Sequence, residues 1–232
     1  MDSSTVPKVI HFCRYNKKTL KRLRIQLILA IFLSAISIDS SSSVNAKADP
    51  LISNPLYREA YAKVESRNYR AALQLFEKLL LNSPRSPGSY YGRAKAKQEL
   101  GDNKGALQDY TMSIQLDPTN PKAFSNRGLA YGSLGDLKKA LADFDQAIKL
   151  DPMFDYAYSN RGVTKGALSD FRGAIKDFDM AIKINQRYGT AWRNRGITKE
   201  LLGDIKGACS DWTKAMTLGQ YDVRQWIALQ CQ

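Results

Sequence analysis

Histidine and cysteine are scarce in this sequence, and their scarcity excludes several kinds of chemistry. The 232 residues contain one histidine, His11, and three cysteines, none of them in a CxxC spacing. Catalytic triads, histidine general bases and the usual zinc sites need such residues in combination. The GxxxxGKS/T phosphate-binding pattern and the dinucleotide-binding glycine pattern are also missing. We therefore predict a protein that is not an enzyme, with no catalytic residue, metal site, cofactor or small-molecule substrate.

A long apolar run is missing as well, except for a short one near the N-terminus. Residues 17–24 (KKTLKRLR) are basic, residues 25–38 (IQLILAIFLSAISI) are apolar, and VNAKA at 44–48 ends in an A-x-A pattern. This order predicts a secretory signal peptide over residues 1–48, cleaved after Ala48 and followed by a short linker at 49–52. Cleavage would also remove His11.

The leader predicts an extracytoplasmic location, which could be the periplasm, the thylakoid lumen or the outside of the cell. No adjacent pair of arginines precedes the apolar run, so a Sec-type route is expected. The run is shorter than the about 20 residues that a transmembrane helix needs. An uncleaved N-terminal membrane anchor is the alternative.

The chain is basic, but much of the excess charge lies in the leader. Residues 1–48 carry eight Lys or Arg against two Asp, a net +6, which leaves +7 of the formal +13 for the remainder. A basic excess can attract nucleic acid or an anionic membrane surface. Secretion argues against nucleic acid, and the remaining charge is spread along many segments. We therefore expect no nucleic-acid partner and keep peripheral membrane association as an alternative.

A repeat with a period of 34 residues begins at Ser53 and continues without a gap. Five blocks span residues 53–86, 87–120, 121–154, 155–188 and 189–222. This period is typical of stacked helix-turn-helix units. Within each block, position 8 is small, position 20 is alanine and position 24 is aromatic. The position 24 residues are Phe76, Tyr110, Phe144, Phe178 and Trp212.

The spacing of these positions predicts two helices per block that pack face to face. Positions 4, 7, 8 and 11 form one helical stripe, and positions 20, 24 and 27 form the stripe opposite it. Gly101, Gly135 and Gly203 at position 15 favour a helix end in the left-handed conformation, and an aspartate follows each as an N-cap.

At these small, aromatic and turn positions, residues 53–222 resemble the tetratricopeptide repeat family. The stretch CSDWTKAMTLG (209–219) and the terminal cysteine also resemble secreted bacterial members, including cyanobacterial ones. The resemblance implies an all-α, right-handed superhelical solenoid of five repeats. Residues 223–232 are predicted to add a C-terminal capping helix.

Position 7, where the family usually has leucine, carries arginine in blocks 2–5, and position 23 carries aspartate in the same blocks. Block 1 has neither, with Glu59 and Leu75 in their places. We therefore predict a structural ion pair inside each hairpin, with the arginine stem packed among aromatic side chains. The pairs are Arg93 with Asp109, Arg127 with Asp143, Arg161 with Asp177, and Arg195 with Asp211. The alternative is that these arginines bind an anionic ligand.

The opposite side of each first helix is the predicted ligand-binding surface, because stacked hairpins curve so that this side lines a concave groove. Position 6 is asparagine in three blocks, as Asn126, Asn160 and Asn194. In peptide-binding members of the family an asparagine here grips the backbone of an extended peptide, and the resemblance implies that role. Lys122, Tyr156 and Arg193 lie beside the asparagines. The alternative is that the asparagines only cap or solvate the helices.

Two cysteines are expected to meet at the C-terminal end of the chain. Cys209 is on the side of its helix that faces the next helix, and Cys231 lies nine residues into that helix. In an oxidising compartment we predict a disulfide, with two buried thiols as the alternative.

Two functions of different classes agree with these features. The first is an extracytoplasmic scaffold that binds peptide segments of partner proteins in its groove, in the assembly of an envelope or membrane complex. The second is a structural module that self-associates or docks on a membrane surface through basic residues.

Overall fold

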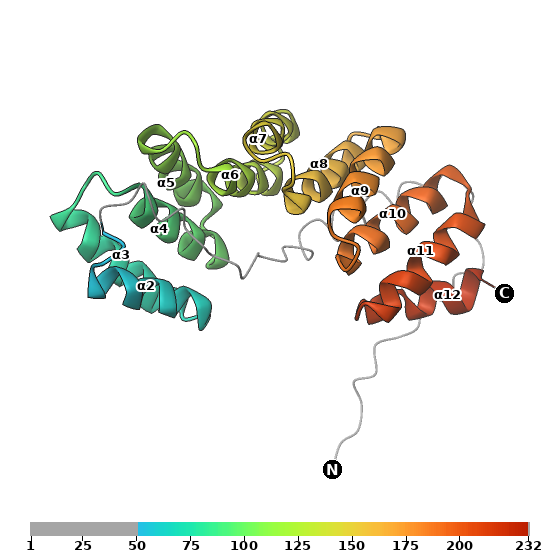
Figure 1. The fold of residues 1–232 in the computed structure, drawn as a ribbon, viewed down its shortest axis with the longest axis horizontal. Coiled ribbons are helices and arrows are strands. Elements are labelled where there is room, and N and C mark those ends of the chain that lie inside the picture. Colours follow the sequence, from blue (N-terminus) through green and yellow to red (C-terminus); the bar gives the residue numbers. More distant parts are fainter. Residues whose placement is uncertain (1–50, 232) are drawn as a thin grey trace, which may run out of the picture. The chain divides into compact units, whose positions relative to one another are not determined.

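Residues 51–231 are described by a computed structural model and are built almost entirely from helices (Figure 1). The predicted signal peptide lies outside these residues. The helices are α2 (Pro55–Glu65), α3 (Tyr69–Asn82), α4 (Pro87–Glu99), α5 (Asn103–Leu116), α6 (Pro121–Ser133), α7 (Leu137–Leu150), α8 (Asp155–Ala167), α9 (Phe171–Ile184), α10 (Gly189–Leu202), α11 (Ile205–Thr217) and α12 (Arg224–Gln230), with a 3-10 turn at Tyr221–Val223 before the last. The predicted all-α fold is confirmed.

Consecutive helices pack as antiparallel hairpins that stack in chain order. The five hairpins are α2 with α3, α4 with α5, α6 with α7, α8 with α9, and α10 with α11. Each second helix also packs on the first helix of the next hairpin. The first helices α2, α4, α6, α8 and α10 contact one another in succession. We call the side of this layer that carries positions 2, 5, 6, 9, 12 and 13 the first-helix face.

The turns inside the hairpins form as the sequence predicts. Asp102, Asp136, Asp170 and Asp204 each accept a hydrogen bond at the N-terminus of the second helix from the backbone N–H three residues ahead. Gly101, Gly135 and Gly203 adopt left-handed backbone angles. Arg67 and Ser169 occupy the same position in their own hairpins with φ of 58° and 67°. A side chain disfavours this conformation, so the stacked hairpin determines the turn even where glycine is missing.

The core consists of the position 24 aromatic rings, each fitted beneath a small residue of its own hairpin. Phe144 has no exposed surface, and a Cβ atom on Gly128 would lie 2.9 Å from its ring and 3.2 Å from the carbonyl oxygen of Ala140. Gly162 lies in the same way over Phe178. Position 8 therefore accommodates an aromatic ring as well as the neighbouring backbone.

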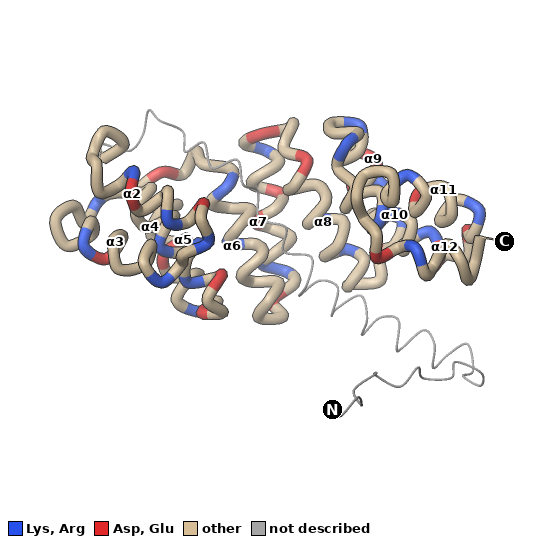
Figure 2. The backbone as a smooth tube through the Cα atoms, turned by 90° about the horizontal axis from the view of Figure 1, so that it is seen from below, with Lys and Arg blue, Asp and Glu red and all other residues tan. Residues whose placement is uncertain are grey.

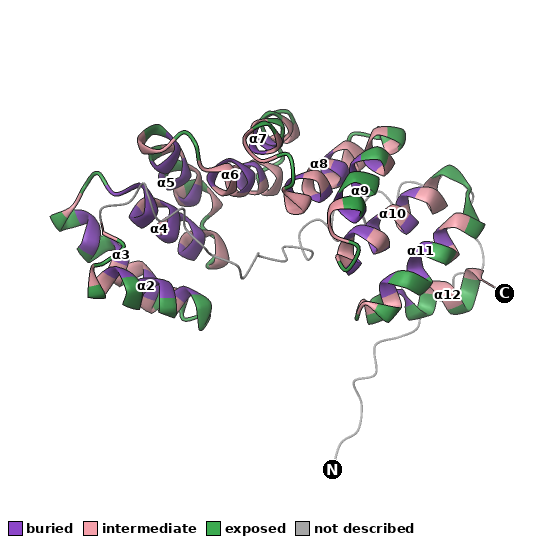
Figure 3. Ribbon diagram, viewed as in Figure 1, coloured by how far each residue is buried: buried purple, intermediate pink, exposed green. Residues whose placement is uncertain are grey.

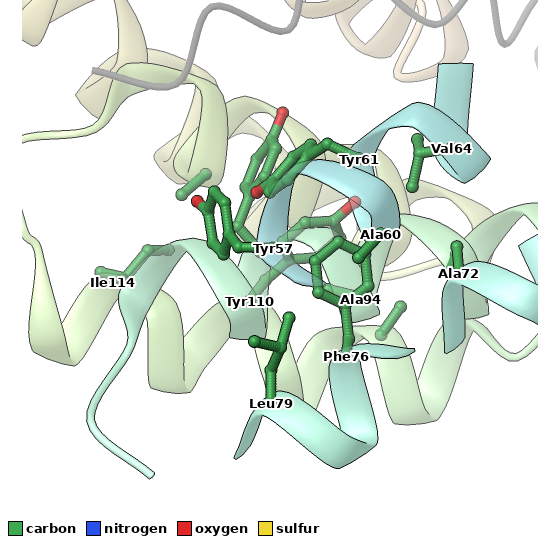
Figure 4. Packing of buried hydrophobic residues seen from close by; sticks show 14 of the residues in the cluster. Tyr57, Ala60, Tyr61, Val64, Ala72, Phe76, Leu79, Ala94, Tyr110 and Ile114 are labelled. Carbon is green, nitrogen blue, oxygen red and sulfur yellow. The ribbon is translucent and has the colours of Figure 1, made fainter. Parts of the chain in front are cut away.

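The first hairpins bury a cluster of aromatic side chains (Figure 4). The ring of Tyr61 meets Phe76 edge to face with 5.2 Å between centroids, and Tyr57 lies 4.8 Å from Tyr61. In α2 to α11, buried and exposed residues alternate along each helix (Figure 3). Within these residues no helix combines the length and apolar character needed to cross a membrane.

Candidate functional site

Each of the four position 7 arginines meets the aspartate that the sequence assigns to it. Nε and Nη2 of every arginine donate to the two carboxylate oxygens at distances between 2.6 and 2.9 Å. The aspartates are buried, with 2 to 6% of their surface exposed. The guanidinium carbon of each arginine lies over a position 4 aromatic ring, and that of Arg195 is 4.7 Å from the ring centroid of Trp192. These arginines are therefore engaged inside the scaffold.

Sequence reasoning missed a second set of contacts that joins neighbouring hairpins. Nη1 of Arg161 donates to Asp145 at 2.6 Å, and Nη1 of Arg195 donates to Asp179 at 2.5 Å. Asp145 and Asp179 belong to the preceding hairpin, 16 residues before the arginine. The intra-hairpin partner lies 16 residues after it, so the same spacing in the opposite direction was readable from the sequence.

Lysines at position 11 complete three of the four ion pairs. Lys97, Lys165 and Lys199 approach Asp109, Asp177 and Asp211 at 2.8 Å. The third repeat has Tyr131 at this position, so Arg127 is the one cation paired with Asp143 among the described residues.

The ion pairs raise the pKa of all four arginines. For Arg93 and Arg127 the hydrogen bonds to aspartate are the largest cause. For Arg161 and Arg195 burial is the largest single effect and lowers the pKa. The hydrogen bonds to two aspartates together outweigh burial, so the pKa is raised overall. The guanidinium groups therefore stay charged at every physiological pH.

Along residues 51–231, basic and acidic residues are interspersed over the hairpins (Figure 2).

The three predicted amides have three different environments. Nδ2 of Asn126 donates to the Tyr91 hydroxyl at 2.9 Å. Asn194 is buried, with 7% exposed, and accepts from Nη1 of Arg193 at 3.2 Å. Asn160 is half-buried, and its side-chain amide has no hydrogen-bond partner among the described residues. Of the three, Asn160 is thus the amide with both hydrogen-bonding groups available.

The prediction that Arg193 and Asn194 line an open groove needs correction. Arg193 is 8% exposed, its Nε donates to Asp222 at 2.6 Å, and its guanidinium lies 5.6 Å from the ring centroid of Trp226. Asp222 and Trp226 belong to the segment that follows α11. That segment therefore covers Arg193, and Asn194 is buried beside it.

The other two predicted residues lie in the first turns of their helices. Lys122 is half-buried at the start of α6, and Tyr156 occupies the equivalent place in α8. The Tyr156 ring is 4.8 Å from that of Tyr188. A Cβ atom on Gly166, further along α8, would meet only the Cβ of Ala174 at 4.0 Å. Packing among the described residues therefore does not require glycine at position 166.

Glu99, at the C-terminal end of α4, is a partly buried acid on the first-helix face. Burial raises its pKa, and a hydrogen bond with Tyr69 opposes the rise. Its Oε1 atom is buried without a partner among residues 51–231. No group of three or more potential metal ligands occurs in that range.

The C-terminal cysteines are joined. Cys209 of α11 and Cys231, which follows α12, form a disulfide with 5.6 Å between their Cα atoms. The bond attaches the end of the chain to the last hairpin.

Two family models match the chain, "Tetratricopeptide repeat" over residues 121–154 and "TPR repeat" over residues 95–135. The chain contains tetratricopeptide repeats. The first match coincides with the third sequence block, which holds α6 and α7. No curated protein sequence matches the chain.

Solved tetratricopeptide repeat structures share the fold at low sequence identity. PilW, described as a widely conserved type IV pilus biogenesis factor, superposes with a TM-score of 0.66 at 22% identity, covering 72% of this chain and 77% of PilW. TTC0263, a thermophilic TPR protein of Thermus thermophilus, gives 0.63 at 20% identity, covering 76% and 97%. YrrB, described as a TPR protein with an unusual peptide-binding site, gives 0.57 at 19% identity, covering 72% and 86%. The tetratricopeptide repeat fold is generally a protein-binding scaffold without catalytic activity.

Proposed function

We propose that this chain is an extracytoplasmic, non-enzymatic scaffold that binds peptide segments of partner proteins on the first-helix face of its third and fourth repeats. The observation that carries the proposal is the side chain of Asn160, which is accessible and has no partner among the described residues. An amide can donate and accept at once, so it can pair with the backbone of an extended peptide whatever the peptide's sequence.

The surroundings of Asn160 suit an uncharged stretch of peptide. Position 9 of the third to fifth repeats is aliphatic and half-buried, as Leu129, Val163 and Ile197. These residues share one register on α6, α8 and α10, which contact one another in succession. Gly166 leaves space on α8, the helix that carries Asn160. A peptide lying across these helices would bury apolar side chains on the aliphatic row while Asn160 holds its backbone.

Two of the similar structures support this assignment. YrrB is described as having a peptide-binding site on the same fold, and PilW is described as a pilus biogenesis factor. For this chain we infer a comparable role in the assembly of an envelope or membrane complex, in which it presents or holds an extended segment of another protein.

Binding through Asn160 can be tested with peptides selected from a displayed random library on the immobilised protein. The selected peptide is expected to bind Asn160→Ala about tenfold more weakly than the unsubstituted protein, because two backbone hydrogen bonds are lost. Asn126→Ala should have a smaller effect, since that amide already donates to Tyr91. The measurement is fluorescence anisotropy with the labelled peptide.

Gln108→Ala provides the matched control, because Gln108 is an exposed amide on the second helix α5. It should leave the affinity unchanged. Equal affinities for Asn160→Ala and Gln108→Ala would show that peptides bind elsewhere and would contradict the proposed site.

The proposed location rests on the leader and on the paired cysteines, since disulfides persist in oxidising compartments outside the cytosol. Expression of the full chain in a bacterium with Sec export should yield a mature protein that begins at Asp49. Mass spectrometry of the intact protein measures the N-terminus. The variant Ala46→Asp with Ala48→Asp should not be cleaved. Recovery of the unsubstituted protein from the cytosol, still uncleaved, would contradict the assignment.

A further inference from the structure

The segment that follows α11 makes a set of polar contacts with the first-helix face of the fifth repeat. We call residues 221–231 the tail. Asp222 of the tail accepts from Arg193 at 2.6 Å, and Nε2 of Gln230 donates to Glu200 at 2.9 Å. Arg193 and Glu200 occupy positions 5 and 12 of the fifth repeat, on α10. The tail therefore lies on the part of the repeat that the proposed function uses for ligands in the third and fourth repeats.

The contact at Arg193 has the form of a carboxylate-binding site. Nε of Arg193 donates to one carboxylate oxygen of Asp222, and Nη1 donates to the amide oxygen of Asn194. The ring centroid of the Trp226 indole lies 5.6 Å from the guanidinium carbon. Arg193 and Asn194 are both more than nine-tenths buried. Position 5 is serine in the third and fourth repeats, as Ser125 and Ser159, so the arginine is particular to the repeat that the tail covers.

The tail packs on the last hairpin through four side chains, those of Val223, Trp226, Ile227 and Cys231. Helix α12 has seven residues and buries none of them, whereas isolated helices shorter than about 12 residues are marginal in water. Val223 is fully buried, and the Trp226 ring packs 5.5 Å from that of Trp212. The covalent attachment is the disulfide between Cys209 and Cys231 at the far end of the tail.

We propose that the tail is an internal ligand that covers a carboxylate-binding site made by Arg193 and Asn194, and that the Cys209–Cys231 disulfide locks it there. Reduction by a dithiol breaks the S–S bond. The two cysteines gain two electrons and two protons to become thiols, and the dithiol becomes a disulfide. The tail can then leave, and the site accepts an acidic peptide segment in place of Asp222.

The lock acts through effective concentration. While both ends of the tail are attached, Asp222 competes at the high local concentration of a tethered group, and a separate peptide cannot displace it. Opening one end lengthens the tether and lowers that concentration. Because Arg193 is a cation, its release from Asp222 leaves a positive charge without its partner, which favours an anionic replacement over a neutral one.

The test uses a labelled peptide with the sequence of residues 220–230, QYDVRQWIALQ, which contains no cysteine. Fluorescence anisotropy measures its binding to the full chain, oxidised or reduced with dithiothreitol. We expect no saturable binding to the oxidised protein and saturable binding to the reduced one. A peptide with asparagine in place of its aspartate should bind the reduced protein about tenfold more weakly, because a charge-assisted hydrogen bond is lost. Hydrogen exchange at the tail amides should speed up on reduction.

Two substituted proteins complete the test. Cys209→Ser with Cys231→Ser should bind the peptide without reductant, and Arg193→Ala should not bind it after reduction. Arg187→Ala is the matched control, since Arg187 is exposed and lies outside the site. The proposal is overturned if oxidised and reduced proteins bind the peptide equally, if neither binds it, if tail exchange is unchanged, or if reduction abolishes the helical circular dichroism. None of these outcomes depends on Asn160, so the result is separate from the test of the proposed function.

Discussion

Arg127→Ala is expected to lower the free energy of unfolding by about 3–5 kcal/mol, because it leaves a buried aspartate without its cation. Asp143 is 6% exposed, and among the described residues Arg127 is the one cation paired with it. Arg161→Ala should cost about 2 kcal/mol less, since Lys165 stays 2.8 Å from Asp177. Urea unfolding followed by circular dichroism measures both values.

The paired substitutions distinguish an ion pair from two independent side chains. Arg127→Leu with Asp143→Leu should be close to neutral, because well-packed apolar residues often replace a buried ion pair without loss. Family members commonly have leucine at position 7, which fits this expectation. If the losses for Arg127→Ala and Asp143→Ala simply add in the double variant, the two residues do not interact and our account of the pair is wrong.

Phe178→Ala is expected to cost about 3–5 kcal/mol, because it opens a cavity beneath the fourth hairpin. Phe178 is 1% exposed and lies against Gly162, whose missing side chain cannot fill the space. Hydrogen exchange should show the loss first in α8 and α9, since each repeat contacts only its neighbours.

Met180→Ala on the same helix is the control for Phe178→Ala. Met180 is 36% exposed, so its truncation should change stability by no more than about 0.5 kcal/mol. A similar loss for both variants would show that the position 24 ring is not the centre of the hairpin core.

The hairpins could be predicted from the sequence because the same pattern of residues recurs in every repeat. One arginine in an apolar stripe is ambiguous, but Arg93, Arg127, Arg161 and Arg195 each have an aspartate at the same offset, and a helical hairpin brings that offset together. The helix caps were readable for the same reason, since Asp136 and its equivalents directly follow the turn residue.

The candidate site was less predictable because its environment depends on which neighbours cover each position. Asn126, Asn160 and Asn194 are equivalent in the repeat, yet a tyrosine of the preceding repeat engages the first, and the third is buried beside Arg193. Arg193 resembled a free groove residue because nothing in the periodicity indicates the path of the chain after the last repeat. The predicted C-terminal capping helix and the cysteine spacing were the two signals that the tail returns to α11.

The arginine contacts between hairpins predict the order in which the repeats unfold. Arg127 reaches back to a neutral threonine, Thr111, at 3.3 Å, whereas Arg161 and Arg195 reach back to aspartates, and the disulfide closes the last hairpin. The first hairpin has neither member of the internal pair. Under mechanical force or heating, the repeats should therefore unfold one after another, beginning with α2 and ending with α11. A protease would then shorten the protein progressively from its N-terminal repeats and leave the C-terminal ones as the last folded fragment.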